Sequence, residues 1–240
     1  MEAESGYLPG GIGWYRKNFI IPADQAGKRV RIDFDGVYMN ATVWINGHEL
    51  GTHPFGYTPF SYDLTDHIKF GEENVIAVKV NHQTPSSRWY SGSGIYRSVD
   101  LTIMEPVHVG LNGTRVTTPD LGKGNSSQVK TVIDTVVDND SDEEQMVKLV
   151  HTLYRKDDPE KTPTATAETE EMTIAPGAAA EFHGEATVAN PELWELDNPS
   201  LYVVETQVQA GGRVTDTCST DFGYRYAEFD SETGFSLNGE

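Results

Sequence analysis

The chain has little cysteine, little positive charge and no long apolar run, and each shortage excludes a class of protein. Cys218 is the only cysteine among 240 residues, so no disulfide can form within the chain. The sequence has 18 basic residues against 37 acidic ones, a net charge of −19 that disfavours nucleic acid and anionic membranes as partners. No apolar run approaches the roughly 18 residues of a membrane-spanning helix. We therefore expect a globular protein with no nucleic-acid partner and no membrane partner.

The usual patterns of metal-binding and catalytic sites are also missing. Asp138, Asp140 and Asp142 begin like a calcium loop, but Glu143 stands where that loop needs glycine and Leu149 where it needs glutamate. We interpret this segment as an acidic hairpin turn. No zinc-ligand spacing links the histidines, and each is predicted to lie on the surface or in a loop: His48, His53, His67, His82, His108, His151 and His183. No metal site is predicted.

Period-two alternation dominates the chain, whereas helical periodicity is almost absent. Val30, Ile32 and Phe34 alternate with charged residues, and the hairpin signal Asn46-Gly47 follows another short apolar run. This pattern predicts an all-β fold: a jelly-roll-like β-sandwich over residues 1–106, followed by an immunoglobulin-like β-sandwich over 107–226. Strands of the second sandwich are expected at 129–137, 145–154, 168–174, 181–188, 202–209 and 214–222. A loop is expected at 191–201, between the strands at 181–188 and 202–209.

Two nearby aspartates raise the question of glycoside chemistry, which uses a pair of carboxylates. Asp33 and Asp35 are two apart on a predicted strand and therefore share a face. They alternate with core residues, so we interpret them as the solvated face of that strand. Taken alone, the residues give no catalytic constellation.

The segment from Ser87 to Arg97 is the richest in recognition chemistry. Arg88, Trp89 and Tyr90 combine a flat apolar surface with hydrogen-bond donors, which is what a sugar site requires. An alternative stays open, because the aromatic residues of a long loop can simply fasten the loop to its own sandwich. For Tyr96 and Arg97, at the entry to the next strand, we favour that structural role.

These residues belong to a set of motifs that resembles a known family, glycoside hydrolase family 2, and most closely its bacterial β-galactosidases. Segments 7–16, 34–37, 43–47, 56–60 and 92–97 resemble its N-terminal sugar-binding domain, the last of them reading Gly-Ser-Gly-Ile-Tyr-Arg. Residues 107–226 resemble the immunoglobulin-like domain that follows in the family. Segment 234–239 resembles the opening of the catalytic (β/α)₈ barrel, and residues 227–240 are therefore expected to begin that barrel.

The resemblance implies a retaining glycosidase whose two catalytic glutamates lie in the barrel, so that no catalytic residue is expected in this chain. It implies that the chain is a non-catalytic N-terminal fragment that shapes the galactoside pocket, with Arg88, Trp89 and Tyr90 as substrate-binding residues. Its expected partners are a β-galactoside or oligosaccharide, its own C-terminal catalytic barrel and a second copy in a homo-oligomer. No cofactor is expected within the fragment, and the resemblance leaves open a divalent or monovalent cation in the full enzyme. The single cysteine and the family's habit indicate a cytoplasmic bacterial protein.

Two alternatives remain open. A β-glucuronidase or β-mannosidase of the same family would keep the architecture and change the sugar; the phrase Gly-Ser-Gly-Ile-Tyr-Arg favours a galactosidase. A free-standing carbohydrate-binding module would also suit two sandwiches, because a fold does not define a function.

Overall fold

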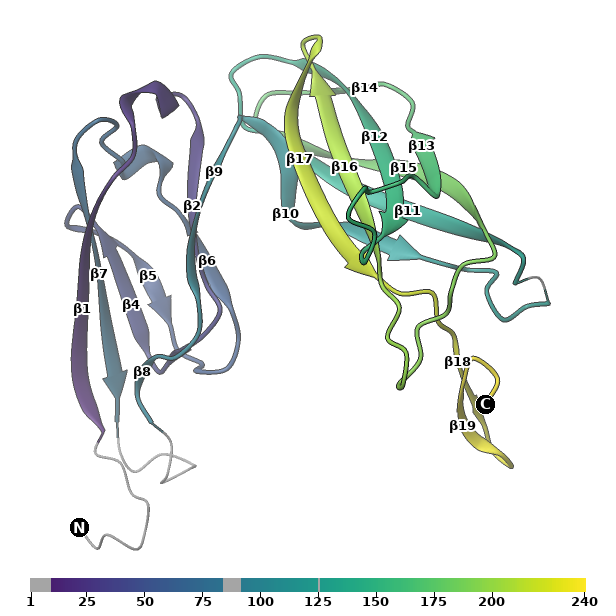
Figure 1. Cartoon of the computed structure of the whole chain (residues 1–240). Helices are drawn as coiled ribbons and strands as arrows, with labels where there is room; N and C mark the ends of the chain where they lie inside the picture. Colours follow the sequence, from purple (N-terminus) through teal and green to yellow (C-terminus); the bar gives the residue numbers. More distant parts are fainter. Residues whose placement is uncertain (1–9, 84–91, 125) are drawn as a thin grey trace, which may run out of the picture. The chain divides into compact units, whose positions relative to one another are not determined.

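A computed structural model describes residues 10–83, 92–124 and 126–240 of the chain. Two compact units follow one another, Met1–Met104 and Glu105–Glu240. Both are built of antiparallel strands, which confirms the predicted all-β fold of two successive sandwiches (Figure 1). Helical structure in the described ranges is confined to the 3₁₀ turns η1 (Ala23–Gln25) and η2 (Thr65–His67). None of these helices is long or apolar enough to cross a membrane.

The first unit consists of two main sheets. One has the strand order β1-β7-β4-β5, the other has the order β6-β2-β9, and a short ladder pairs β3 with β8. The strands are β1 (Gly11–Ile20), β2 (Arg29–Phe34), β3 (Val37–Tyr38), β4 (Ala41–Ile45), β5 (His48–His53), β6 (Phe60–Asp63), β7 (Glu73–His82), β8 (Gly94–Ile95) and β9 (Val99–Met104).

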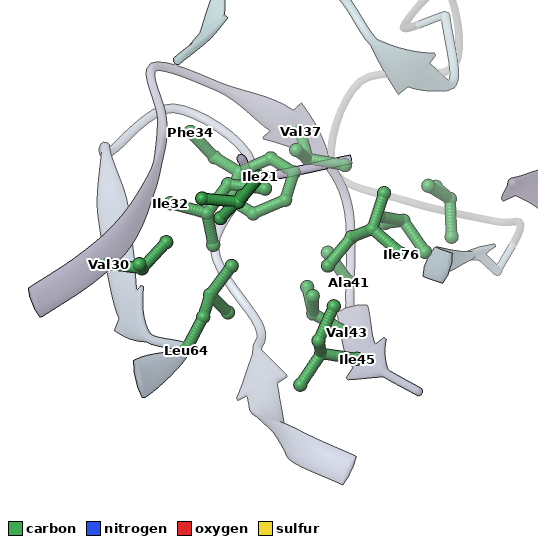
Figure 2. Packing of buried hydrophobic residues seen from close by; sticks show 12 residues of the cluster. Ile21, Val30, Ile32, Phe34, Val37, Ala41, Val43, Ile45, Leu64 and Ile76 are labelled. Carbon is green, nitrogen blue, oxygen red and sulfur yellow. The ribbon is translucent and has the colours of Figure 1, made fainter. Parts of the chain in front are cut away.

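The core of the first unit follows from the alternation in its strands. Every second residue of β2, β4 and β7 is buried, because successive side chains of a strand point to opposite faces. Figure 2 shows the resulting cluster, in which residues such as Phe34 and Ile32 point toward Val43 and Ile45 of the facing sheet. Burying one such side chain stabilises the fold by about 1.5–3 kcal/mol. The predicted Asn46-Gly47 hairpin joins β4 to β5, and both turn residues have positive φ, as a type I′ turn requires.

The second unit is also a sandwich of two sheets. One sheet has the order β10-β11-β15 and the other β13-β12-β16-β17, with β14 also paired to β12; β18 and β19 form a separate hairpin. The strands are β10 (Val107–Thr117), β11 (Gln128–Asn139), β12 (Gln145–Arg155), β13 (Ala165–Glu168), β14 (Met172–Ile174), β15 (Ala178–Ala189), β16 (Tyr202–Ala210), β17 (Arg213–Phe222), β18 (Ala227–Asp230) and β19 (Gly234–Leu237).

The sequence prediction needs one correction among these strands. A single strand was expected at 168–174, but β13 ends at Glu168 and β14 begins at Met172. Thr169 interrupts the run: its hydroxyl accepts a hydrogen bond from the Leu149 amide of β12 at 3.0 Å. A side chain therefore takes the place of a ladder bond, which alternation alone does not reveal.

Three histidines also contradict the expectation of surface or loop positions. His82, His108 and His151 are buried, with 1%, 4% and 0% of their surface exposed. His82 and His151 lie at inward positions of β7 and β12, where the alternation places a core residue. The prediction treated histidine as polar and gave the strand period too little weight.

Candidate functional site

The segment that follows residue 91 is fixed to the sandwich by the ladder between β3 and β8. Tyr38 pairs with Gly94 in this ladder. Gly94 has φ of +122°, and a Cβ added there would lie 2.2 Å from the hydroxyl of Tyr15. Only glycine fits this position, because a side chain would need both an unfavourable backbone conformation and the space that Tyr15 occupies.

Tyr96 fastens the other end of the same segment. Its hydroxyl donates to the carbonyl of Gly56 at 2.7 Å, and its ring covers Gly36, where a Cβ would lie 2.7 Å from Tyr96 Cζ. The guanidinium of Arg97 lies 5.1 Å from the centre of the Tyr96 ring and donates to the carbonyl of Asp35 at 3.4 Å. Both residues make the structural contacts that the sequence favoured for them.

Aromatic rings gather beside this segment. Tyr38 is almost fully buried, and its ring meets Tyr57 edge-on at 5.3 Å and His82 edge-on at 5.0 Å. Phe55 contacts Tyr57 at 5.6 Å, and about half of each of these two side chains is exposed. The close approach depends on Gly56, where a Cβ would lie 2.1 Å from Tyr38 Cδ2.

A polar contact ties the strand β7 to the segment after residue 91. Nδ1 of His82 is hydrogen-bonded to the hydroxyl of Ser93, and Nε2 of His82 has no partner among the described residues. His82 is thus a buried anchor with one nitrogen still available for a hydrogen bond.

Beside these contacts lies an open pocket of about 220 Å³. It is lined by Tyr38, Tyr57, Tyr96, Gly92 and Ser93. Flat rings with phenol and serine hydroxyls fit the apolar face and the hydroxyl groups of a small polar ring such as a sugar. The described lining residues carry phenol and hydroxyl groups and no carboxylate, so these residues are suited to binding and orienting a molecule.

The predicted substrate-binding residues Arg88, Trp89 and Tyr90 lie outside the described residues, and their role stays a prediction. Gly92 and Ser93, which follow that segment in the sequence, line the pocket.

The aspartate pair considered from the sequence does not form a catalytic site. The Asp33 carboxylate accepts hydrogen bonds from Arg31 Nε at 2.9 Å, Ser61 Oγ at 2.6 Å and Thr102 Oγ1 at 3.1 Å. Burial raises the pKa of Asp33, but these bonds and the Arg31 charge outweigh it and hold the pKa below its usual range. Asp33 is therefore an ionised structural group, and Asp35 lies beyond the end of β2.

Metal chemistry finds no support in the described part of the chain. No group of three or more His, Cys, Asp or Glu side chains there could hold a metal ion. The acidic segment after Val137 closes the turn between β11 and β12, as predicted, and Asn139 organises it by donating to the carbonyls of Glu143 and Ile174 at 2.9 Å each.

Sequence reasoning marked Gly92 and Ser93 as part of an informative segment but missed the rings around them. Tyr38 and Tyr57 are far from that segment in sequence and reach it only through the β3–β8 ladder and the loop before β6. The phrase Phe55-Gly56-Tyr57 carried a signal, because a glycine can mark a site where another group approaches closely, and at Gly56 that group is the ring of Tyr38.

The described residues thus define a class of protein: a chain of two β-sandwiches whose first unit holds a small aromatic pocket suited to a sugar. Comparison with known families matches both units. Residues 7–105 match the model "Glycosyl hydrolases family 2, sugar binding domain", and residues 111–225 match "Glycosyl hydrolases family 2". The chain belongs to glycosyl hydrolases family 2.

Similar proteins include some that are named beta-galactosidase and others that are named beta-glucuronidase. A beta-galactosidase of Bacteroides ovatus, BoGH2A, is 43% identical over 235 residues, which are 98% of this chain and 27% of that protein. A putative beta-glucuronidase of Formosa agariphila is 38% identical over 98% of this chain and 21% of its own length. A solved family 2 member from Bacteroides cellulosilyticus has a TM-score of 0.91 at 36% identity, covering 98% of this chain and 32% of that one. The chain therefore spans about a quarter of the length of these curated relatives.

Proposed function

We propose that this chain is the sugar-binding and immunoglobulin-like part of a retaining β-galactosidase whose catalytic glutamates lie elsewhere in the protein. The observation that carries the proposal is the aromatic pocket, because it lies in the unit that matches the family's sugar-binding model and is lined by the residues that follow segment 84–91. The name of the Bacteroides ovatus relative supports galactoside as the substrate.

In this proposal the chain orients the sugar and does not transfer protons. Arg88 donates to two sugar hydroxyls, while Trp89 and Tyr90 form the wall of the pocket, so that the glycosidic bond is presented to the catalytic carboxylates in a fixed geometry. The proposal includes a β-galactoside or oligosaccharide as substrate and the catalytic barrel as partner. The second unit serves as a brace for that barrel.

A β-glucuronidase is the second candidate, and a specific observation favours it. The Formosa agariphila relative at 38% identity carries that name, and a glucuronidase would use the Arg88 guanidinium to pair with the sugar carboxylate.

Turnover of nitrophenyl β-galactoside, β-glucuronide and β-mannoside by the longest product of the gene separates these candidates. We expect preference for the galactoside, and no turnover by the 240-residue chain alone. Preference for the glucuronide would replace the first candidate by the second. Turnover by a clean preparation of the 240-residue chain would contradict the proposal that its catalytic groups lie elsewhere.

Arg88 provides the sharpest single test. Arg88→Ala should lower kcat/KM for the galactoside roughly 5- to 150-fold, because a sugar hydroxyl loses its donor. This corresponds to a loss of about 1–3 kcal/mol of transition-state stabilisation. Lys123→Ala, an exposed cation of the second unit, serves as the control. Unchanged kinetics for Arg88→Ala would remove this residue from the site.

A further inference from the structure

The outer face of the sheet β1-β7-β4-β5 carries two tryptophans whose rings meet. Trp14 of β1 and Trp44 of β4 have ring centroids 5.2 Å apart, with 32° between the ring planes. Figure 1 shows β7 between these two strands, so the rings approach one another across the middle strand. The registers explain how: Trp44 is opposite Ala77, whose small side chain leaves room over β7.

These rings are not core residues. Trp14 is 62% exposed, and neither tryptophan belongs to the buried cluster of the first unit or packs against it. The pair therefore leaves a flat apolar surface in contact with water, held on three hydrogen-bonded strands. Large exposed aromatic surfaces on rigid elements are typical of binding sites.

Two cations flank the rings on the same face. Lys79 pairs with Trp14 across β1 and β7, and Arg16 pairs with Ala77, beside Trp44. Neither cation has a carboxylate partner within the described ranges. Several other lysines do, for example Lys130 with Glu185 and Lys156 with Asp221. In a chain with twice as many acidic as basic residues, two unneutralised cations beside an aromatic pair form a local positive surface.

The acidic residue nearest in register does not cancel this charge. Glu49 is opposite Trp44 on β5, next to the bulge that follows Val43. Its charge acts on Tyr62 of the other sheet: burial and then Glu49 raise the pKa of that phenol. Glu49 lies on β5, two strands from Lys79 on β7 and three from Arg16 on β1, or roughly 10 Å and 14 Å across the sheet, which is too far for a direct ion pair with either cation.

We propose that this face binds a uronate-bearing polysaccharide, with sugar rings stacked on Trp14 and Trp44 and carboxylates paired with Lys79 and Arg16. Aromatic faces take the apolar side of a sugar ring, and the two cations complement an acidic chain. This goes beyond the proposed function, because it assigns polymer binding to a surface that needs no catalytic residue.

The charges also argue against a second copy of this chain on the same face. A two-fold symmetric contact would bring the same patch together from both copies, so that Lys79 and Arg16 would face like charges. A glycan has no such conflict. The hydroxyl pair of Thr42 and Thr52, 2.8 Å apart on the neighbouring strands, adds hydrogen-bonding groups at the rim of the patch.

Native gel electrophoresis of the 240-residue chain through polygalacturonate tests the proposal. We expect retardation that weakens as NaCl is raised, because screening reduces the pairing of carboxylates with cations. Trp14→Ala and Lys79→Gln should each weaken the apparent affinity at least tenfold. Two matched controls should bind like the parent: Phe229→Ala, whose side chain is 82% exposed elsewhere, and Lys123→Gln of the second unit. Unchanged circular dichroism of all variants establishes that they fold.

Four outcomes would overturn the proposal. In the gels, these are no retardation of the parent chain, equal retardation of the parent chain and of Trp14→Ala, or retardation in a neutral galactan gel that is as strong as in polygalacturonate. In sedimentation, the fourth is a dimer that Trp14→Ala dissociates, found while no glycan binds. None of them depends on hydrolysis, so the proposed glycosidase function stands or falls separately.

Discussion

At the scale of single residues, Gly56 determines whether Tyr38 can form the wall of the aromatic pocket. A Cβ at this position would lie 2.1 Å from Tyr38 Cδ2, within the ring's own volume. Gly56→Ala should therefore displace Tyr38 and destabilise the first unit by about 1–3 kcal/mol, the usual cost of overpacking a well-packed site. Chemical denaturation followed by tryptophan fluorescence measures the change.

Gly13→Ala is the matched control for that variant. A Cβ at Gly13 meets nothing within 4 Å, and its φ is not positive. It should leave the unfolding midpoint within about 0.5 kcal/mol of the parent. Equal destabilisation by the two variants would contradict the role assigned to the Gly56–Tyr38 contact.

His151 makes the stability of the second unit depend on pH. Its Nδ1 is hydrogen-bonded to Thr206 at 2.9 Å, its Nε2 is buried with no partner in the described part of the chain, and burial lowers its pKa to about 4. The folded state keeps this imidazole neutral, whereas the unfolded chain takes up a proton near pH 6.5. The contribution of His151 to the free energy of unfolding should therefore be fully present above pH 6.5. The free energy of unfolding should then fall by roughly 3 kcal/mol as the pH drops toward 4.

Urea unfolding between pH 7 and pH 4.5 tests this expectation, and two variants separate it from other groups. The double variant His151→Leu/Thr206→Val removes both hydrogen-bonding partners and should flatten the profile. His183 acts in a different pH range: its hydrogen bonds with Asp134 and Glu185 raise its pKa, so its contribution is fully present below pH 6.5 and is lost as the pH rises above that value. His183→Gln should therefore change the profile only above pH 6.5 and leave the decline below it in place. A profile that is the same with and without His151 would refute the assignment.

At the scale of elements, one buried hydrogen bond joins β11 to the segment after β17. The hydroxyls of Thr131 and Tyr224 are 2.8 Å apart, both residues are fully buried, and burial raises the pKa of Tyr224 to about 12. Tyr224→Phe should cost about 1–3 kcal/mol of unfolding free energy, because it leaves the Thr131 hydroxyl without a partner.

A double-mutant cycle checks this bond. Adding Thr131→Val to Tyr224→Phe removes the orphaned hydroxyl, so the double variant should be less destabilised than the sum of the two single variants, with a coupling of about 1 kcal/mol. Additive single effects, within error, would show that the two hydroxyls do not stabilise one another. Thermal unfolding of the four proteins supplies the measurement.

The elements themselves were largely predictable, for a simple reason. Strands such as β2, β11 and β16 have one buried face and one solvated face. Apolar and polar residues therefore alternate along their sequences, and this alternation predicts a strand. The prediction failed where a side chain replaced the backbone ladder, as at Thr169 between β13 and β14. It also failed where a polar residue filled a core position, as His151 does; Gly184 provides the space for that ring, since a Cβ there would lie 2.7 Å from His151 Cδ2.

At the scale of the whole molecule, the net charge predicts how the solubility of the chain depends on pH. The chain carries −19 at pH 7 and has a sequence pI of about 4.6. Repulsion between copies should keep it dispersed at neutral pH, and solubility should pass through a minimum near pH 4.6. Light scattering across pH 3–8 measures this directly. A minimum above pH 6 would show that association is driven by a local surface instead of by net charge.

The sequence by itself determined the fold class, the succession of two sandwiches and the family, because alternation, turn residues and contiguous motifs are local properties of the chain. It also marked segment 92–97 as informative. Only the tertiary structure decided which residues surround that segment and which tryptophans share a face. Tyr38 and Tyr57 reach Gly92 through the pairing of β3 with β8, and Trp14 meets Trp44 through the register of three strands. Pairing between strands distant in sequence depends on the packing of the whole unit, so residue order alone does not reveal it.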